Sequence, residues 1–163
     1  MKILLHTCCA PCSIYCIEEL KKEKMQIDLF WYNPNIYPES EYQKRKQTLE
    51  QYSKTIGINM IVGVAAHGDP FLKLGNCENC YKTRLEQTAK YAKENGYDGF
   101  STTLLISPYQ KHELIKSIGN ELGKFIYRDF RPGFRIGQAK AKELELYRQK
   151  YCGCSFSKEN KNG

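Results

Sequence analysis

The sequence lacks both a long apolar segment and a secretory leader. No run reaches the roughly 18 apolar residues that a membrane-spanning helix needs. The first residues, MKILLHTCC, also lack the apolar stretch and small-residue cleavage site of a signal peptide. These absences exclude a transmembrane protein and predict a cytoplasmic one. In such a reducing compartment, clustered thiols are more often metal ligands or redox centres than disulfides.

Repeats, low-complexity segments and obvious linkers are absent too. We therefore expect a single domain over residues 1–157, followed by a polar tail at 158–163. A glycine-rich phosphate loop is missing after the first expected strand, where HTCCAPCS stands instead. This absence argues against a nucleotide-dependent transferase that modifies RNA on a similar scaffold.

The charge is unbalanced toward the positive side. Lys and Arg number 25 against 18 for Asp and Glu, which gives a formal net charge of +7. A basic surface favours a polyanionic partner such as nucleic acid, although many ordinary soluble domains are equally basic. Charge alone therefore leaves RNA binding open.

Short apolar runs alternate along the chain with segments of helical length. The expected strands cover residues 2–7, 27–33, 58–63, 99–103 and 124–130, and the expected helices cover 11–24, 40–55, 77–95, 111–122 and 137–149. This alternation is typical of a parallel sheet with helices on both faces and right-handed crossovers. We expect a three-layer, Rossmann-like (HUP-like) α/β domain whose mostly parallel sheet has about five strands. Ligands of such sheets bind beyond the carboxyl ends of the strands.

Cysteines occur in three groups that are far apart in the sequence. The pairs are Cys8 with Cys9 after the first strand, Cys77 with Cys80 in NCENCYKTR, and Cys152 with Cys154 in YCGCSFS. Each pair is a moderate signal by itself, but together they predict convergence on one soft-metal site. The helix expected from Pro11 would place its positive N-terminal end beside the first pair, where it favours thiolates.

The remaining two cysteines differ in their expected roles. Cys12 lies one helical turn nearer the proposed site than Cys16 and is expected to be a ligand, whereas Cys16 shares an apolar face with Leu20. Leaving out Cys16, the other cysteines exceed the four ligands of one structural zinc site. A 4Fe-4S cluster beside a second metal ion fits this number, and so do two zinc ions that share thiolates. Spacing does not choose between them.

Five segments carry a specific pattern. In chain order they are HTCCAPCS at 6–13, the CxxCY stretch at 77–81, STTLLISPYQ at 101–110, RDFRPGFRIG at 128–137 and YRQKYCGCSFS at 147–157. Together they resemble the cobalamin-independent epoxyqueuosine reductases, the QueH family, over nearly the whole chain. The resemblance implies reduction of the epoxide of epoxyqueuosine in the tRNA anticodon loop to the alkene of queuosine, with the oxygen leaving as water.

The resemblance also implies the cofactors and partners. Members are expected to carry a 4Fe-4S cluster and a nearby second metal ion, for which iron is the expected identity. The partners would be tRNA carrying epoxyqueuosine and an electron donor such as ferredoxin or flavodoxin, with no membrane. The expected metal ligands are Cys8, Cys9, Cys12, Cys77, Cys80, Cys152 and Cys154. The resemblance also implies an Asp in some relatives at the position of Cys12, so that this ligand position can supply oxygen or sulfur.

The proton donor and the base-binding residues are harder to identify. Candidate donors are Tyr109, Asp129 and His6, although His6 also fits a hydrogen-bonded supporting role on its strand. The pocket for the modified base is expected to include Ser101, Thr102, Thr103 and Gln110. The alternative for each of these residues is ordinary capping of a strand end or turn.

Basic residues near the expected site are candidates for RNA contacts. We expect Lys82, Arg84, Arg131 and Arg135 to bind phosphates near an extruded base, although solvated surface is the usual role of such residues. The rival interpretation of the whole chain is a cysteine-rich structural zinc protein that binds RNA without redox chemistry.

Overall fold

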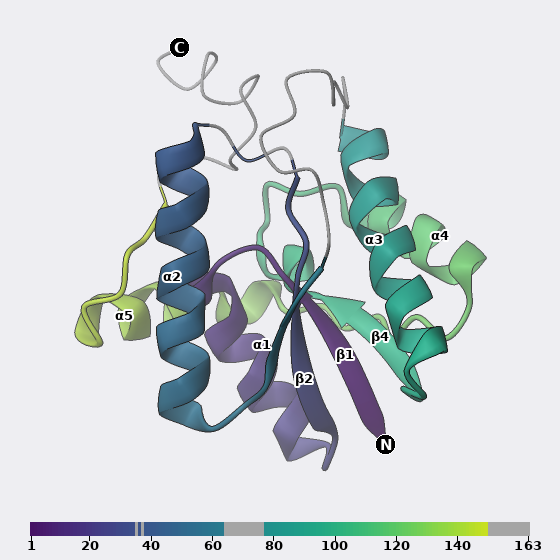
Figure 1. The fold of residues 1–163 in the computed structure, drawn as a ribbon, viewed down its shortest axis with the longest axis horizontal. Helices are drawn as coiled ribbons and strands as arrows, with labels where there is room; N and C mark the ends of the chain where they lie inside the picture. The colour runs from purple at the N-terminus through teal and green to yellow at the C-terminus, as the bar shows by residue number, and fades with distance from the viewer. Residues whose placement is uncertain (35, 37, 64–76, 150–163) are drawn as a thin grey trace.

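The computed structural model describes residues 1–34, 36, 38–63 and 77–149. Within these ranges the chain forms a parallel sheet of four strands with helices on both sides (Figure 1). The strands are β1 (Lys2–Thr7), β2 (Gln26–Trp31), β3 (Met60–Val62) and β4 (Gly99–Thr102). The helices are α1 (Ala10–Lys22), α2 (Glu39–Ile56), α3 (Cys77–Glu94), α4 (His112–Leu122) and α5 (Phe134–Glu143), with short 3-10 helices η1 (Thr103–Ile106) and η2 (Arg131–Gly133).

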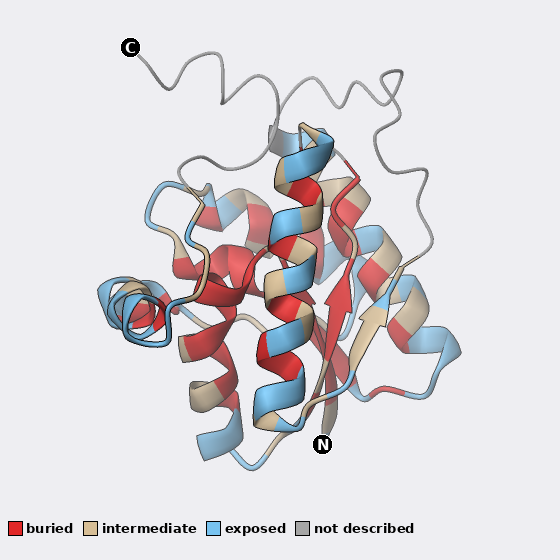
Figure 2. Cartoon of the chain, turned by 60° about the vertical axis from the view of Figure 1, so that its left-hand side comes forward, coloured by how far each residue is buried: buried red, intermediate tan, exposed pale blue. Residues whose placement is uncertain are grey.

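The strand order β3-β2-β1-β4 places β1 between two parallel neighbours. Its residues Ile3, Leu4 and Leu5 are fully buried. Because successive side chains point to opposite faces, such a run requires cover on both sides. Helices α1, α2 and α5 lie on one side and α3 and α4 on the other (Figure 1). Figure 2 shows the buried residues gathered in the sheet and along the inward sides of the helices. The predicted three-layer α/β fold is confirmed.

The register brings three strand ends together at the carboxyl edge of the sheet. His6 pairs with Thr102 of β4, and Thr7 pairs with Trp31 of β2. The segments that leave these strands therefore start side by side, although they are far apart in the sequence. The first of them contains Cys8 and Cys9.

The strand predicted at 124–130 is much shorter in the structure. It is reduced to an isolated parallel bridge between Phe100 and Phe125, held by hydrogen bonds from Phe100 N–H to Lys124 O and from Ile126 N–H to Phe100 O. The ladder stops there because the hydroxyl of Ser101 donates to the carbonyl of Ile126 at 2.8 Å. A side chain thus occupies the acceptor next to the bridge.

The last helix also differs from its expected range of 137–149. It begins at Phe134, directly after η2, because Pro132 has a fixed φ that suits a helical first turn. It ends at Glu143, and Glu145 takes a positive φ of 58°. The backbone N–H of Leu146 then closes the end by donating to Ala141 O. Residues 146–149 therefore lie outside the helix.

No helix in the described ranges is long and apolar enough to cross a membrane.

Two glycines let η2 and α5 approach α1 closely. A Cβ atom at Gly133 would lie 2.0 Å from Cγ of Tyr15, and one at Gly137 would lie 3.0 Å from the carbonyl oxygen of Pro11. This contact matters for the site because α1 starts at the cysteine-containing loop.

We predict that Gly133→Ala destabilises the protein by about 1–3 kcal/mol, because the methyl group overlaps the Tyr15 ring. Chemical denaturation of the single and double variants checks this. In a Tyr15→Ala background the same substitution should have a much smaller effect, since the overlapping ring is gone. Equal losses in the two backgrounds would contradict this packing.

Candidate metal centre

Cys8, Cys9 and Cys12 form a thiol triad where β1 passes into α1. Their Sγ atoms all lie within 4.8 Å of one another. Cys9 is the N-cap of α1, and its sulfur accepts a hydrogen bond from Cys12 N–H at 3.4 Å. The N–H of Cys8 donates to Thr103 Oγ1 at 3.2 Å, which ties the loop to the end of β4. The structure thus brings together three of the predicted ligands.

The three thiols differ in how readily they ionise. Hydrogen bonds from the thiols of Cys12 and Cys9 lower the pKa of Cys8 well below its ordinary value. Burial raises the pKa of Cys9, and the hydrogen bond to Cys8 is the largest cause of the raised pKa of Cys12. Ionisation is therefore favoured at Cys8 over Cys9 and Cys12, and a bound soft metal would displace the protons of the thiols that it binds.

The end of the described chain reaches this triad. The side-chain amide of Gln149 donates to the sulfur of Cys9 at 2.7 Å and lies 3.6 Å from that of Cys12. Two residues earlier, the hydroxyl of Tyr147 donates to the Glu41 carboxylate of α2, at 2.8 Å from Oε1. These contacts hold the segment after α5 across α2 and against the thiols.

Arg45 places a buried positive charge beside the same group. Its side chain is 1% exposed, and its Nε donates to Glu41 Oε1 at 2.8 Å. Burial opposes the charged form, but Glu41 and the sulfurs of Cys9 and Cys8 together raise the pKa of Arg45. The guanidinium is therefore a fixed cation near the triad.

Arg84 provides a second buried cation, on the α3 side. It is only 5% exposed, and its Nη1 donates to the sulfur of Cys80 at 2.6 Å. Its Nε donates to Asn33 Oδ1 at 3.2 Å, and the Asn33 amide donates in turn to Thr7 O at 2.9 Å. Cys80 is thus connected through two side chains to the residue before Cys8. Such burial favours a role at the sulfur over the predicted contact with RNA phosphate.

His6 is fully buried next to this network. Burial, and next the charge of Arg84, lower its pKa to about 4, so the ring is neutral at pH 7. Because the carbonyl of Tyr32 only accepts, Nε2 carries the proton and donates to it at 3.2 Å. Nδ1 then accepts from the Thr102 hydroxyl at 2.9 Å. These bonds match the supporting role considered for His6 and do not suit a proton donor.

The predicted base-binding residues separate into two groups. Thr102 and Thr103 lie at the site, since Thr102 bonds His6 and Thr103 Oγ1 is 3.4 Å from the sulfur of Cys8. Ser101 is buried and donates to Ile126 O, which is a structural contact. Gln110 accepts a hydrogen bond from the Tyr81 hydroxyl at 2.5 Å.

The other two proton-donor candidates lie on the surface. Tyr109 is 85% exposed. Asp129 forms a two-bond ion pair with Arg131, with both N–O distances at 2.8 Å. Hydrogen bonding from Arg131 lowers the pKa of Asp129 to about 2, so its carboxylate has no proton to give at neutral pH.

The basic candidates have different partners. Lys82 forms an ion pair with Glu78 at 3.1 Å, and Arg131 is paired with Asp129. Arg135 is exposed and forms no ion pair with any described residue. The α3 backbone begins at Cys77, whose side chain is outside the description, and Cys152 and Cys154 lie outside the described residues. Their predicted ligand roles stay predictions.

Several residues of the site were missed by sequence reasoning. Tyr147 and Gln149 stand just before Cys152, and this position was an available signal. Asn33 is the first amide after the second strand and could also have been suspected. Arg45 gave no signal, because a charged residue in an amphipathic helix is ordinarily exposed.

Comparison with known sequences identifies the family. The sequence model described as "Epoxyqueuosine reductase QueH" matches residues 3–160. The chain belongs to the QueH family. A QueH relative from Dehalococcoides mccartyi is 36% identical over 173 residues, covering 99% of this chain and 95% of the relative. One from Thermotoga maritima is 35% identical over 175 residues, covering 95% and 89%.

A solved structure shares the fold. The U34-tRNA thiolase NcsA from Methanococcus maripaludis, solved with its 4Fe-4S cluster, superposes with a TM-score of 0.62 at 14% identity. The match covers 99% of this QueH chain and 64% of the thiolase. At this identity the likeness supports the Rossmann-like fold alone.

The donor set in this QueH chain fits a soft metal. Three clustered sulfurs, one of them with a lowered pKa, match the preference of iron–sulfur and zinc centres for thiolates. Oε1 of Gln149 is buried and has no hydrogen-bond partner among the described residues. An unpartnered buried acceptor beside the thiols marks a position where a bound group can satisfy it.

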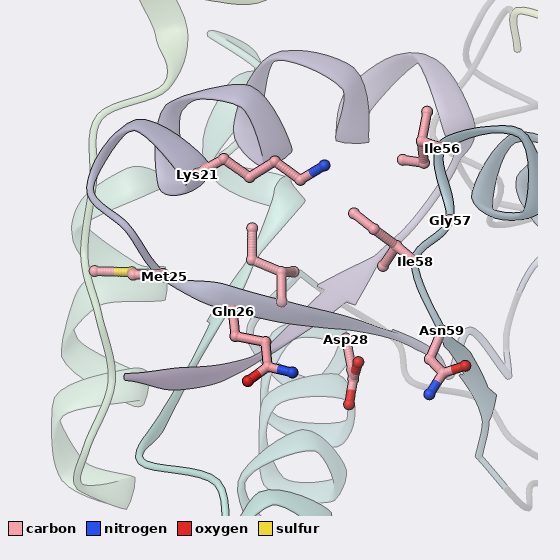
Figure 3. A pocket seen from close by; sticks show the side chains of 9 residues that line it. Lys21, Met25, Gln26, Asp28, Ile56, Gly57, Ile58 and Asn59 are labelled. Carbon is pink, nitrogen blue, oxygen red and sulfur yellow. The ribbon is translucent and has the colours of Figure 1, made fainter.

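A separate hollow opens at the opposite edge of the sheet (Figure 3). Its volume is about 360 Å³, and it is lined by residues such as Lys21, Gln26 and Asn59 near the amino ends of the strands. No cysteine lines it. It is therefore distinct from the thiol site.

We predict that Cys8→Ser, Cys9→Ser and Cys12→Ser each weaken metal binding by more than about 10-fold. Anaerobic reconstitution followed by iron and sulfide analysis measures the effect. Cys16→Ser is the matched control, because Cys16 is fully buried in α1 and its thiol donates to Cys12 O at 3.3 Å. Equal metal loss in all four variants would contradict the assignment of the triad.

Proposed function

We propose that the protein reduces the epoxide of epoxyqueuosine in tRNA to the alkene of queuosine. Two C–O bonds break, one carbon–carbon π bond forms, and the oxygen leaves as water after taking up two electrons and two protons. The observation that carries this proposal is the buried thiol triad at the carboxyl edge of a sheet whose sequence belongs to the QueH family.

The proposed cofactors are a 4Fe-4S cluster and an adjacent second metal, expected to be iron. Cys8, Cys9, Cys12 and Cys80 would hold them together with Cys77, Cys152 and Cys154. Gln149 already lies at the triad, and an extended chain covers about 3.5 Å per residue, so a cysteine three positions later can reach it. When bound, the cluster supplies single electrons and the second metal supplies an electrophile for the departing oxygen.

The chain's own residues would prepare this site in three ways. Arg45 and Arg84 balance the negative charge of the thiolates. Thr103 orients Cys8, because its hydroxyl oxygen accepts a hydrogen bond from the backbone N–H of Cys8. Neutral His6 fixes the carboxyl end of β1 against Thr102 and Tyr32 without adding a second positive charge.

For the substrate, we propose contacts between tRNA phosphates and the exposed basic residues Lys82, Arg131 and Arg135. A small one-electron carrier such as ferredoxin or flavodoxin would deliver the electrons. Both partners would have to approach the carboxyl edge of the sheet, because the thiols lie there.

We predict that anaerobically reconstituted protein converts tRNA bearing epoxyqueuosine to tRNA bearing queuosine when a chemical reductant is supplied. Mass analysis of the digested nucleosides should show loss of one oxygen. Protein fully loaded with iron that gives no such product would contradict the proposal. A colourless protein that binds RNA and retains only zinc would support the structural zinc alternative.

A further inference from the structure

Tyr109 is an exposed aromatic residue at the edge of the sheet that carries the thiols. At 85% exposure it is the most exposed large hydrophobic side chain in the described part of the chain. It follows η1, which begins with Thr103, the residue bonded to Cys8. A single exposed aromatic residue is common on protein surfaces. Its neighbours are therefore needed to judge whether Tyr109 binds a ligand.

The loop that presents Tyr109 is fixed on both sides. The Tyr81 hydroxyl donates to Gln110 Oε1 at 2.5 Å and accepts from the N–H of Lys111 at 3.0 Å. Tyr81 is next to Cys80 at the start of α3, so the loop is fastened beside the CxxC pair. Ser107 Oγ accepts the N–H of Tyr109 itself at 3.1 Å. These hydrogen bonds fix the backbone of the loop, and the Tyr109 ring extends from it into solvent.

The ring is also oriented by a neighbour. Its edge-to-face contact with Phe134 has ring centroids 6.1 Å apart and planes at 83°. Phe134 is the first residue of α5, and Arg135 follows it, exposed and without an ion pair to any described residue. The oriented ring of Tyr109 thus contacts the residue that precedes the exposed Arg135 in α5.

This combination fits one kind of ligand. Single-stranded RNA is bound by stacking unpaired bases on aromatic side chains while basic groups contact the phosphates. An apolar protein partner would leave the Arg135 charge without a counterpart. A proton donor would need its hydroxyl held near the reacting atoms, but the Tyr109 hydroxyl forms no hydrogen bond with a described residue.

We propose that Tyr109 is a stacking platform for an unpaired base of the tRNA loop, with Arg135 contacting a phosphate of the same strand. This proposal rests on the proposed function, because it assumes that an RNA loop approaches the thiol site. It replaces the expectation that Tyr109 donates a proton.

The test compares Tyr109→Phe, Tyr109→Ala and Leu122→Ala in the reconstituted protein. The ligand is a hairpin with the anticodon-loop sequence and without epoxyqueuosine, so binding does not depend on the reaction. Leu122 is the matched control, since it is an exposed apolar residue at the far end of α4. Circular dichroism confirms that each variant folds.

Loss of a stacking base should weaken binding roughly 5- to 100-fold in Tyr109→Ala. Tyr109→Phe and Leu122→Ala should bind within about twofold of the wild type, since the phenyl ring still stacks and Leu122 is remote. A hairpin with 2-aminopurine in the loop should lose fluorescence on binding, except with Tyr109→Ala.

Unchanged hairpin affinity in Tyr109→Ala would overturn the stacking role. A Tyr109→Phe variant that binds the hairpin normally but loses epoxide reduction would leave stacking intact and overturn the exclusion of the Tyr109 hydroxyl from proton donation. Failure of the proposed function looks different, because wild-type protein would then bind the hairpin through Tyr109 and still leave the epoxide intact.

Discussion

The structure depends on gathering several thiols in a poorly solvated place at one edge of a parallel sheet. Burial removes water from a thiolate, and a thiolate at one cysteine raises the pKa of its neighbours. The opposite pKa shifts of Cys8 and Cys12 illustrate this second effect. Positive charge offsets this cost from three directions. The N-terminus of α1 points at the triad, Arg45 approaches from α2, and Arg84 donates to Cys80 from α3.

The surrounding fold follows from this arrangement. Parallel strands end at the same edge, so the loops after β1 and β4 meet without long connections, and Thr103 can hold Cys8. Glu41 links α2 to the segment after α5, because it pairs with Arg45 of its own helix and accepts the Tyr147 hydroxyl. That link brings Gln149 to Cys9.

Much of this could be predicted from the sequence, for identifiable reasons. Buried runs such as ILLH and helix-starting residues such as Pro11 depend on local patterns, so β1 and the start of α1 were predicted within a residue or two. Cysteine clusters are uncommon enough to predict a shared site, and the described part of the chain brings together Cys8, Cys9 and Cys12 of that prediction. The fifth strand failed because Ser101 intercepts a carbonyl 25 residues away, a contact that no local pattern encodes. The roles of three charged residues could not be predicted for the same reason, because contacts made in the fold decide them. These residues are Arg45, Arg84 and Asp129.

Mössbauer spectroscopy of protein reconstituted anaerobically with ⁵⁷Fe tests the central claim most directly. It distinguishes the iron atoms of a thiolate-bound cluster from a separate single iron, and it detects iron that is bound without sulfur. The account predicts signals of a 4Fe-4S cluster together with a distinct iron site. Iron held without thiolate ligation, or a fully folded protein that takes up zinc and no iron, would contradict it.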